Sequence, residues 1–406
     1  MNNDNKPWIT EDAFISPWTY QARQDMNLPE KVTIYDVTLR DGEQYAGLVF
    51  RKEDKVRIAK ALDALGVERL EGGMPVSSNE DFEALKEIVK SVKANVVSFC
   101  RGMTGDVDMA LEAGVWGVIV EVPSNERLIK VGYRWEQKDV IEKAVTTCNY
   151  AKKHGLHTTF FLIDSSGSEP EWLRPIVQET VSQADIDSIA AVDTFGRLNP
   201  AGTRLFVQRM KEWVGDIPVE IHVHNDFGLA VANSLAAVEA GAEVVHTNIL
   251  GIGERSGGAA TEEIAIGLKY LYGLDPRLNL EKLVETANIF KEISGIPFPG
   301  HKPVVGDNSF AYEAGIPAMF SDRLFKDNFP LGVMPIMPEV VGNEFKIAIG
   351  KKSGQYNIQW HLEKTGRSAT EDQLRDIVDR VKEEALKKRR ALTDEEVDKI
   401  VDEICK

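Results

Sequence analysis

The stretch "VEIHVHNDFGLAVANSLAAVEAGAEVVHTNIL", residues 219–250, contains one complete strand–helix–strand unit. Residues 219–224 and 243–250 are short apolar runs rich in Val and Ile, which is typical of buried strands. Residues 230–241 repeat apolar side chains at helical spacing and end in a glycine, the residue that most often closes a helix. This order of elements predicts parallel strands in one sheet with helices packed on it.

The same alternation continues towards the N-terminus. Helix-forming segments such as 52–66 and 79–92 separate further apolar runs. Eight strand–helix units within about 250 residues predict an α/β fold, the closed (β/α)8 or TIM barrel. An open doubly wound sheet is the alternative, and it is disfavoured because no G-x-G-x-x-G follows the first strand. The other six predicted strands are 32–37, 67–73, 95–99, 116–122, 157–163 and 187–193.

The pattern changes after about residue 275. We expect a catalytic barrel over 25–290, followed by a Gly- and Pro-rich linker or first subdomain over 291–338. Residues 339–406 then predict a small second subdomain of charged helices. The charge runs of these helices are interpreted as solvated faces.

Composition narrows the class of protein. The 406 residues are 43% hydrophobic and 28% charged, which is typical of a globular chain. A net charge of −16 argues against nucleic acid or an anionic membrane as a partner. Three scattered cysteines without C-x-x-C spacing, no long apolar run and no basic leader favour a cytoplasmic protein acting on small molecules.

The histidine pair in the quoted stretch raises the question of a metal. His222 and His224 are two apart in a strand, so both side chains point to one face. With a carboxylate from another strand they form an N,N,O ligand set that leaves positions open for substrate. For an isolated pair, two buried and hydrogen-bonded histidines are the more common alternative. Asp41, in "TLRDGEQ" after the first strand, supplies the carboxylate, although Asp-Gly is also a common turn.

Polar residues stand at the end of nearly every predicted strand, where a TIM barrel carries its active site. Arg40 suits a carboxylate or a developing oxyanion. We take Glu43 and Asp164 as candidate catalytic carboxylates. Candidate substrate-binding residues at these strand ends are Gln44, Glu71, Ser98, Arg101 and Thr194.

The glycine-rich segment "GIGERSGG", residues 251–258, follows the eighth strand. Its backbone N–H groups could hold an anion such as the diphosphate of a CoA thioester. Gly251, Gly253 and Arg255 are therefore candidate CoA-binding residues. A tight turn without a ligand is the alternative.

Three ordered motifs resemble one known family. "DVTLRDGEQ" (36–44), "HVHNDFGLAVANSLAAVEAGA" (222–242) and "LGIGERSGGAATEE" (250–263) are similar to those of the metal-dependent, Claisen-condensing 2-isopropylmalate and homocitrate synthases. The likeness continues through "KPVVGDNSFAYEAGI" (302–316) and "PEVVGNEFKIAIGKKSG" (338–354). The motifs are nearest to those of homocitrate- or Re-citrate-synthase-like members.

The resemblance implies a TIM-barrel acyltransferase that joins acetyl-CoA to a 2-oxo acid and releases CoA. Asp41, His222 and His224 match the ligands of a divalent metal, Mg²⁺ or Mn²⁺, with Zn²⁺ and Co²⁺ as alternatives. Arg40 matches the arginine that stabilises the alkoxide, and Thr194 matches a threonine that holds the substrate carboxylate. Gln44 matches a further substrate-side residue, and members of the family are homodimers.

Two departures from the family pattern affect the proton transfer. The family linker carries two histidines around "ESGIH", whereas this chain reads "AYEAGIP", with Tyr312 and Pro317 in those places. Either Tyr312 or His301 is then expected to act in their stead, or the chemistry of this chain differs from that of the family. Asp164 stands where members commonly have Glu. The chain also ends without the C-terminal domain that confers leucine inhibition, so no leucine inhibition is expected.

Three functions follow, in order of preference. The first is a homocitrate- or citrate-synthase-like enzyme acting on a dicarboxylic 2-oxo acid, 2-oxoglutarate or oxaloacetate, with Arg101 as the partner of the second carboxylate. An ion pair at the surface is the alternative role of Arg101. The second is a 2-isopropylmalate-synthase-like enzyme acting on 2-oxoisovalerate. The third is a lyase of the same superfamily that cleaves a 3-hydroxyacyl-CoA, disfavoured because the loop 251–258 lacks a cysteine.

Overall fold

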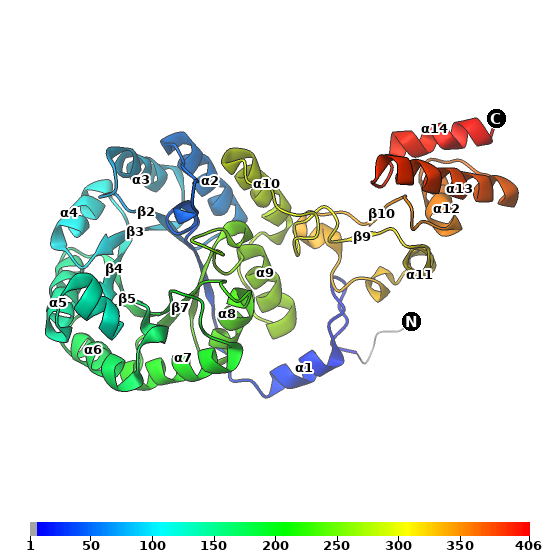
Figure 1. The fold of residues 1–406 in the computed structure, drawn as a ribbon. Helices are drawn as coiled ribbons and strands as arrows, with labels where there is room; N and C mark the ends of the chain where they lie inside the picture. The colour runs from blue at the N-terminus through cyan, green and yellow to red at the C-terminus, as the bar shows by residue number, and fades with distance from the viewer. Residues whose placement is uncertain (1–5) are drawn as a thin grey trace. The chain divides into compact units, whose positions relative to one another are not determined.

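Eight parallel strands form a closed barrel in the order of the sequence, and the last strand pairs with the first (Figure 1). This computed structural model describes residues 6–406. The prediction of a TIM barrel is confirmed, and all eight predicted strands are present. The strands are β1 (Thr33–Asp36), β2 (Arg69–Gly73), β3 (Asn95–Arg101), β4 (Gly117–Pro123), β5 (His157–Ile163), β6 (Ser188–Asp193), β7 (Val219–Val223) and β8 (Val244–Thr247).

Helices surround the strands, as Figure 1 shows. Gly66, Gly114, Gly155 and Gly241 each follow a helix with positive φ, and the helix end predicted at residue 241 is among them. The helices of this part of the chain are α2 (Lys52–Leu65), α3 (Asn79–Ser91), α4 (Thr104–Ala113), α5 (Gln137–Lys153), α6 (Pro170–Gln183), α7 (Pro200–Val214), α8 (Ala230–Glu239), α9 (Thr261–Ile266) and α10 (Leu283–Ser294).

The barrel interior is filled by side chains from alternate strand positions. Aromatic and branched residues form one buried cluster, in which the rings of Phe99 and Phe161 meet edge to face at 5.7 Å. Because side chains alternate along a strand, Glu220, His222 and His224 share the inward face of the β7 region. The cluster consists of Tyr35, Val37, Val97, Phe99, Ile119, Phe161, Ala190, Val192 and Val244.

The described chain divides into two compact units. One is Gln21–Pro297, and the other is Phe298–Lys406 together with the described residues up to Tyr20. The second unit contains a two-stranded sheet, β9 (Ala311–Tyr312) paired with β10 (Lys346–Ile347). The proposed division of 291–406 at residue 338 stays a prediction. The remaining helices are α1 (Pro17–Gln24), which the sequence analysis missed, α11 (Gly315–Lys326), α12 (Gln355–Lys364), α13 (Glu371–Lys388) and α14 (Asp394–Ile404).

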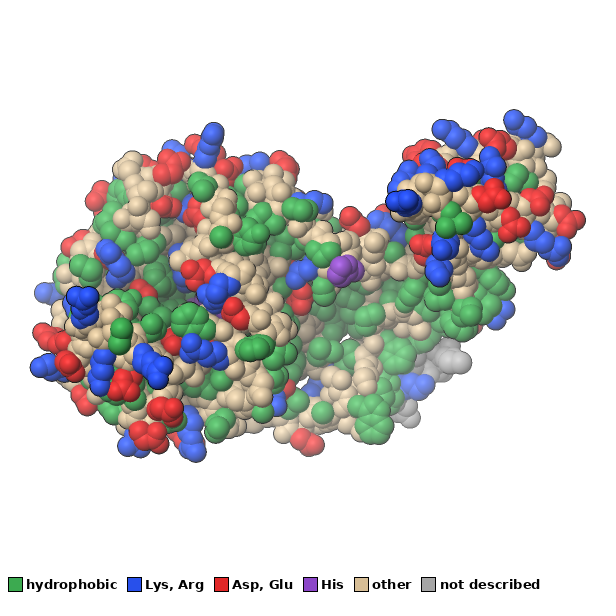
Figure 2. Space-filling model, in the orientation of Figure 1, with side chains coloured by type: hydrophobic (Ala, Val, Ile, Leu, Met, Phe, Trp, Pro, Cys, Tyr) green, Lys and Arg blue, Asp and Glu red, His purple; other side chains and the backbone are tan. Residues whose placement is uncertain are grey.

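The helices α12, α13 and α14 enclose an apolar core of their own. Ile358, Ile377, Val381 and Val397 are fully buried in it. The charged residues of these helices lie on the outside. Figure 2 shows Lys, Arg, Asp and Glu side chains intermixed on the visible surface. Within residues 6–406, no helix has the length and apolar character needed to cross a membrane.

Candidate metal centre and active site

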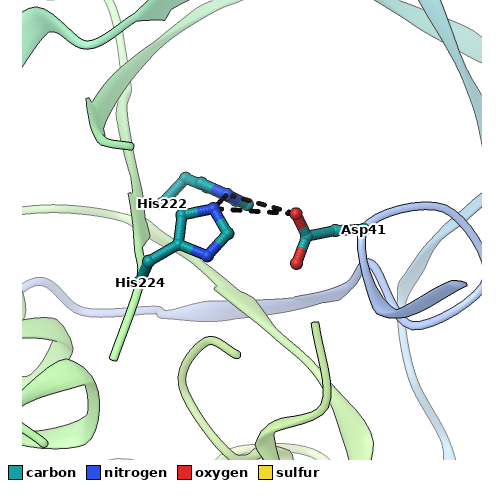
Figure 3. A group of neighbouring side chains, drawn as sticks. All are labelled: Asp41, His222 and His224. Atoms are coloured by element: carbon teal, nitrogen blue, oxygen red, sulfur yellow. Dashed lines mark hydrogen bonds and ion pairs between the residues drawn. The ribbon is translucent and has the colours of Figure 1, made fainter. Parts of the chain in front are cut away.

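The three predicted metal ligands lie together at the end of the barrel where the strands finish. Asp41 follows β1, His222 lies in β7 and His224 directly follows β7, and all three side chains are buried. Figure 3 shows both imidazoles facing the carboxylate. The Nε2 atoms of the two histidines are 3.3 Å apart, and they lie 3.9 and 3.7 Å from Oδ1 of Asp41. The structure therefore brings together the predicted N,N,O set.

These separations fit one shared ion. The histidine-to-carboxylate distances are too long for hydrogen bonds, whereas the two Nε2 atoms lie within hydrogen-bonding distance of each other. An ion bonded at roughly 2.1 Å to two ligands holds them about 3.0–3.5 Å apart, close to the observed spacing. Burial and the neighbouring imidazoles hold the pKa of His222 well below its usual value, which keeps the ring neutral and able to bind a metal.

The glycine-rich loop packs directly against this centre. The carbonyl oxygen of Gly257 lies 3.2 Å from Nδ1 of His224 and accepts its proton, which leaves Nε2 for a metal. A Cβ at Gly253 would lie 2.8 Å from Oδ2 of Asp41, and one at Gly257 would overlap the carbonyl oxygen of Gly251. The glycines are thus needed for the loop to approach the ligands.

Three N–H groups of this loop already donate to backbone carbonyl groups nearby. Gly251 donates to Asn248, Gly257 donates to Glu254, and Gly258 donates to Gly251. Arg255 lies in an ion pair with Asp226 and also donates to the carbonyl oxygen of Thr194. The CoA-binding role of Gly251, Gly253 and Arg255 stays a prediction, whereas the loop's contact with the ligands is a feature that the sequence analysis missed.

A buried chain of polar groups stands behind His222. Its Nδ1 lies 3.2 Å from Nδ1 of His246, and Nε2 of His246 lies 2.7 Å from Oε2 of Glu220. Arg69 donates to Oε1 of Glu220 at 2.9 Å, and Ser188 donates to the same oxygen at 2.6 Å. Burial would raise the pKa of Glu220, but the hydrogen bond from His246 and the charge of Arg69 hold it at about 2. This carboxylate is therefore ionised at neutral pH.

Asn248 completes the surroundings of Asp41. Its Nδ2 donates to Oδ2 of Asp41 at 3.2 Å, on the side of the carboxylate away from the two Nε2 atoms. The sequence analysis placed His246 and Asn248 in the eighth strand but gave them no role. Asn248 lies just beyond the end of β8, because the strand ends at Thr247. Both residues point into the barrel from the segment beside β7, the strand that carries the histidine ligands. This position could have identified both from the sequence.

Arg40 lies beside Asp41 with only 10% of its side chain exposed, in a position suited to anion stabilisation. Its Nε donates to Oε2 of Glu71 at 2.6 Å and its Nη1 to Oε1 of Gln44 at 3.2 Å. The guanidinium lies over the ring of Phe99, with its carbon 4.0 Å from the ring centroid. Its Nη2 atom is buried and has no hydrogen-bond partner within residues 6–406. One strong donor is thus left for a ligand.

Two carboxyl groups that point into the barrel near Arg40 have raised pKa values. Burial raises the pKa of Glu71, although Arg40 opposes the shift. Burial raises the pKa of Glu121, at the end of β4, to about 7 against the charges of Arg40 and Arg101. The Glu121 carboxyl forms no hydrogen bond or ion pair with any other residue of the described range 6–406. Glu121 falls within the predicted strand 116–122, and the sequence analysis assigned it no role.

Glu43 is held by contacts inside the protein. Its Oε1 accepts a hydrogen bond from the backbone N–H of Phe50, and its Oε2 lies in an ion pair with Lys55. Lys55 is almost completely buried and also pairs with Asp81. A buried lysine needs such paired carboxylates, because an unpaired charge in the interior is costly. The catalytic role of Glu43 stays a prediction, and its visible role is to neutralise Lys55.

Asp164 and Thr194 are neighbours at the ends of β5 and β6. Oγ1 of Thr194 accepts a hydrogen bond from the backbone N–H of Asp164 at 2.8 Å. The Asp164 carboxylate pairs with Nη1 of Arg197 at 3.1 Å. Burial raises the pKa of Asp164, although the charge of Arg197 opposes the shift.

The remaining predicted substrate residues lie at the end of β3. Ser98 is completely buried, with the Cys100 sulfur 3.9 Å from its hydroxyl. Arg101 makes a two-point salt bridge to Asp106, with Nε and Nη2 each 2.9 Å from a carboxylate oxygen. This ion pair is the alternative that the sequence left open for Arg101, and a substrate contact through Nη1 stays a prediction.

Similarity to known proteins supports the assignment of the site. Residues 31–290, more than half of the chain, match the HMGL-like family. The chain is also 41% identical over 390 residues to the homocitrate synthase AksA of Methanopyrus kandleri, covering 95% of this chain and 96% of that protein. The chain belongs to the HMGL-like family. The resemblance to homocitrate and isopropylmalate synthases is confirmed.

A second relative and a solved structure extend the comparison. A probable 2-isopropylmalate synthase of Methanopyrus kandleri is 38% identical over 357 residues, covering 88% of this chain and 70% of that protein. The crystal structure of hydroxymethylglutaryl-CoA lyase from Pseudomonas aeruginosa aligns with a TM-score of 0.60 at 21% identity, covering 67% of this chain and 96% of that one. At this identity the likeness shows the fold alone.

The two predicted proton-transfer residues of the HMGL-like chain lie outside the barrel unit. His301 and Tyr312 belong to the unit that contains Phe298–Lys406. The Tyr312 hydroxyl donates to the backbone carbonyl of Val333, and its ring packs near that of Phe345. Their roles in catalysis stay predictions.

Proposed function

We propose that this chain is an acyltransferase that condenses acetyl-CoA with a 2-oxo acid and releases CoA. The observation that carries the proposal is the buried set Asp41, His222 and His224 on a barrel of the HMGL-like family. The full-length similarity to a homocitrate synthase supports the synthase reaction over the lyase reaction. The loop after β8 also lacks the cysteine expected of such a lyase.

Asp41, His222 and His224 would hold one divalent metal ion, which we propose to be Mg²⁺ or Mn²⁺, with Zn²⁺ and Co²⁺ as alternatives. When bound, the ion supplies Lewis-acid polarisation of the substrate ketone. The protein contributes the arrangement of the three ligands, with His224 oriented by Gly257 and Asp41 oriented by Asn248. Two neutral imidazoles and one carboxylate suit a divalent ion in charge and in donor type.

Arg40 would stabilise the negative charge that develops on the ketone oxygen. Its buried Nη2 has no partner in the described chain, while Glu71 and Gln44 hold the rest of the guanidinium in place. A fixed donor in a site that excludes water lowers the energy of such an oxyanion more than a mobile one does. Thr194 would donate its hydroxyl proton to the substrate carboxylate, since its oxygen already accepts from the Asp164 N–H.

For the substrate we propose a dicarboxylic 2-oxo acid, 2-oxoglutarate or oxaloacetate. The support is the homocitrate synthase relative, which matches over almost the whole length of both chains. In this proposal the unpaired Nη1 edge of Arg101 meets the second carboxylate. The alternative is 2-oxoisovalerate, favoured by the similarity to a probable 2-isopropylmalate synthase.

The acetyl methyl group needs a proton acceptor, and we propose it among Asp164, Tyr312 and His301. Asp164 is supported by its place at the end of β5 and its raised pKa. Tyr312→Phe removes the hydroxyl group while keeping the ring, and an unchanged kcat would show that Tyr312 takes no part in the proton transfer. A homodimer and a cytoplasmic location, both expected from sequence, are tested by light scattering and by cell fractionation.

The substrate test is an incubation with acetyl-CoA, Mg²⁺ or Mn²⁺ and a panel of 2-oxo acids, in which free CoA is followed with a thiol reagent. We expect release with 2-oxoglutarate or oxaloacetate and little with 2-oxoisovalerate. The reverse order would replace the dicarboxylic assignment. No release with any member of the panel would contradict the synthase function.

A further inference from the structure

We propose that His246 and Glu220 are positioning residues that determine which ring nitrogen of His222 is free to bind the metal. The proposal rests on the metal centre proposed above and not on the identity of the 2-oxo acid. The residues form an unbroken buried path from the ligand His222 through His246 to Glu220.

The two ligand histidines are oriented by different means. His224 has its Nδ1 next to the carbonyl oxygen of Gly257, which can only accept a proton. That contact fixes the tautomer of His224 without further help. His222 has its Nδ1 next to another imidazole nitrogen, which can either donate or accept. A second group is therefore needed to decide the direction of the hydrogen bond between His222 and His246.

Glu220 is that second group. Its Oε2 lies 2.7 Å from Nε2 of His246, and an ionised carboxylate can only accept a proton. In a neutral His246 ring the single proton is then on Nε2, which leaves Nδ1 as an acceptor. The Nδ1 of His222 in turn carries a proton and donates it to His246. The Nε2 of His222, which faces Asp41, is left with its lone pair for the metal.

The carboxylate is itself held in one orientation. Arg69 and Ser188 both donate to Oε1 of Glu220, so Oε2 remains directed at His246. Thr159 also lies within 3.3 Å of Oε1. All of these groups lie in the barrel interior, where a misdirected proton would leave two donors facing each other.

Glu220→Gln tests this path because it changes the direction of one hydrogen bond with almost no change in shape. Arg69 and Ser188 would continue to donate to the amide oxygen, so the amide NH₂ would face His246. His246 would then accept at Nε2 and donate from Nδ1, and His222 would carry its proton on Nε2. The variant is expected to bind Mn²⁺ about 10–100-fold more weakly, the loss typical of an altered partner behind a ligand.

The matched control is Asp187→Asn. Asp187 also neutralises a cation, Lys152, and lies 3.6 Å from a histidine, His157. Within residues 6–406 it forms no hydrogen bond or ion pair with the metal ligands, His246 or Glu220. We expect Asp187→Asn to leave Mn²⁺ affinity within about twofold of the parent protein. Isothermal titration with Mn²⁺ and thermal unfolding of the metal-free proteins compare both variants.

A spectroscopic measurement decides the proposal independently of catalysis and of how well the variant folds. In metal-free protein labelled with ¹⁵N-histidine, NMR should show the proton of His222 on Nδ1 and that of His246 on Nε2. In Glu220→Gln the proton of His222 should move to Nε2. A parent protein with the proton of His222 on Nε2, or an unchanged Mn²⁺ affinity in folded Glu220→Gln, would overturn the proposal. Failure of the synthase reaction would leave these results unaffected.

Discussion

Charged side chains are placed differently in the barrel and in the three C-terminal helices. In the barrel, charged groups such as Asp41, Glu71 and Glu220 are buried and hydrogen-bonded to other polar side chains. In α13 and α14 the charged groups are exposed and form short-range pairs, for example Arg375 with Asp372. Exposed pairs of this kind contribute little to stability, with typical values of at most about 1 kcal/mol.

The difference shows where chemistry is located. A buried charge costs several kcal/mol unless partners surround it, so a protein that retains many of them in one place has a use for them there. The core of the C-terminal helices is built from apolar residues such as Ile377 and Val381, and the buried His361 beside it is paired with Asp398. We therefore expect substitutions in the barrel to change binding and turnover, and substitutions in the helices to change stability.

The largest expected effect comes from the metal ligands. Asp41→Ala or His224→Ala removes one of three ligands, and turnover should fall at least about a thousandfold, because Lewis-acid stabilisation is worth several kcal/mol. Mn²⁺ binding should be lost in parallel, as measured by titration calorimetry. Full activity in a variant that no longer binds metal would show that the ion is not used.

These ligands could be predicted from sequence, whereas the path behind them could not. The spacing of His222 and His224 places them on one face of a strand, and the order of the strands brings Asp41 to the same end. The contact between His246 and Glu220 depends on the inclination of β7 and β8 and on the depth of each residue in the barrel. The alternation of residues along a strand shows which face each side chain is on, but not how deep in the barrel it lies.

The second effect concerns the helical core. Ile377→Ala leaves a cavity in that core and should lower the free energy of unfolding of the helices by about 2–5 kcal/mol. Chemical denaturation followed by circular dichroism measures this loss. Asp379→Ala, on the exposed side of the same helix, should change it by no more than about 0.5 kcal/mol. Unaltered Mn²⁺ binding in Ile377→Ala would support the separation of roles, and a loss comparable to that of Asp41→Ala would break it.

Third is the close approach of the glycine-rich loop to the metal site. Gly253→Ala places a Cβ 2.8 Å from Oδ2 of Asp41, so either the loop or the carboxylate must move. Mn²⁺ affinity should fall by at least about tenfold. Gly105→Ala, with no atom within 4 Å of its new Cβ, is the matched control and should bind Mn²⁺ normally. Equal affinities in the two variants would show that the loop does not support the ligands.

The fold was more accessible from sequence than the loop. The apolar runs predicted all eight strands, because strands buried on both faces are apolar throughout. Helix α1 was missed, since "PWTYQARQ" has no buried residue and thus no apolar face to reveal it. The proximity of Gly253 to Asp41 was also missed. A glycine in a sequence can indicate that there is no room for a side chain, but it does not show which neighbouring atom occupies the space.

The last effect is a pH dependence of stability from the barrel interior. Burial raises the pKa of Asp36 to about 7, above the value near 3.9 of an unfolded chain. The folded state then binds more protons between these values, so this group makes stability fall as pH rises from about 4 to about 7. Urea denaturation at pH 5 and pH 8 should show a smaller loss in Asp36→Asn than in the parent protein.

Glu396, on the surface of α14, has the opposite sign. Hydrogen bonds from Arg390 and Lys388 lower its pKa, so its contribution is lost as pH falls. Glu396 is ionised in the folded and the unfolded chain at any pH well above 4.5. Glu396→Gln should therefore leave the change in stability between pH 5 and pH 8 unaltered. An equal pH dependence in Asp36→Asn and the parent protein would contradict the account of buried charge.

The most direct test of the metal centre is pulsed electron paramagnetic resonance of the Mn²⁺-loaded protein. Asp41, His222 and His224 predict one ion per chain, with couplings to two histidine nitrogens. Each single variant, His222→Ala or His224→Ala, should reduce these to one or abolish binding. A tightly bound ion with no histidine coupling in the parent protein would contradict the account.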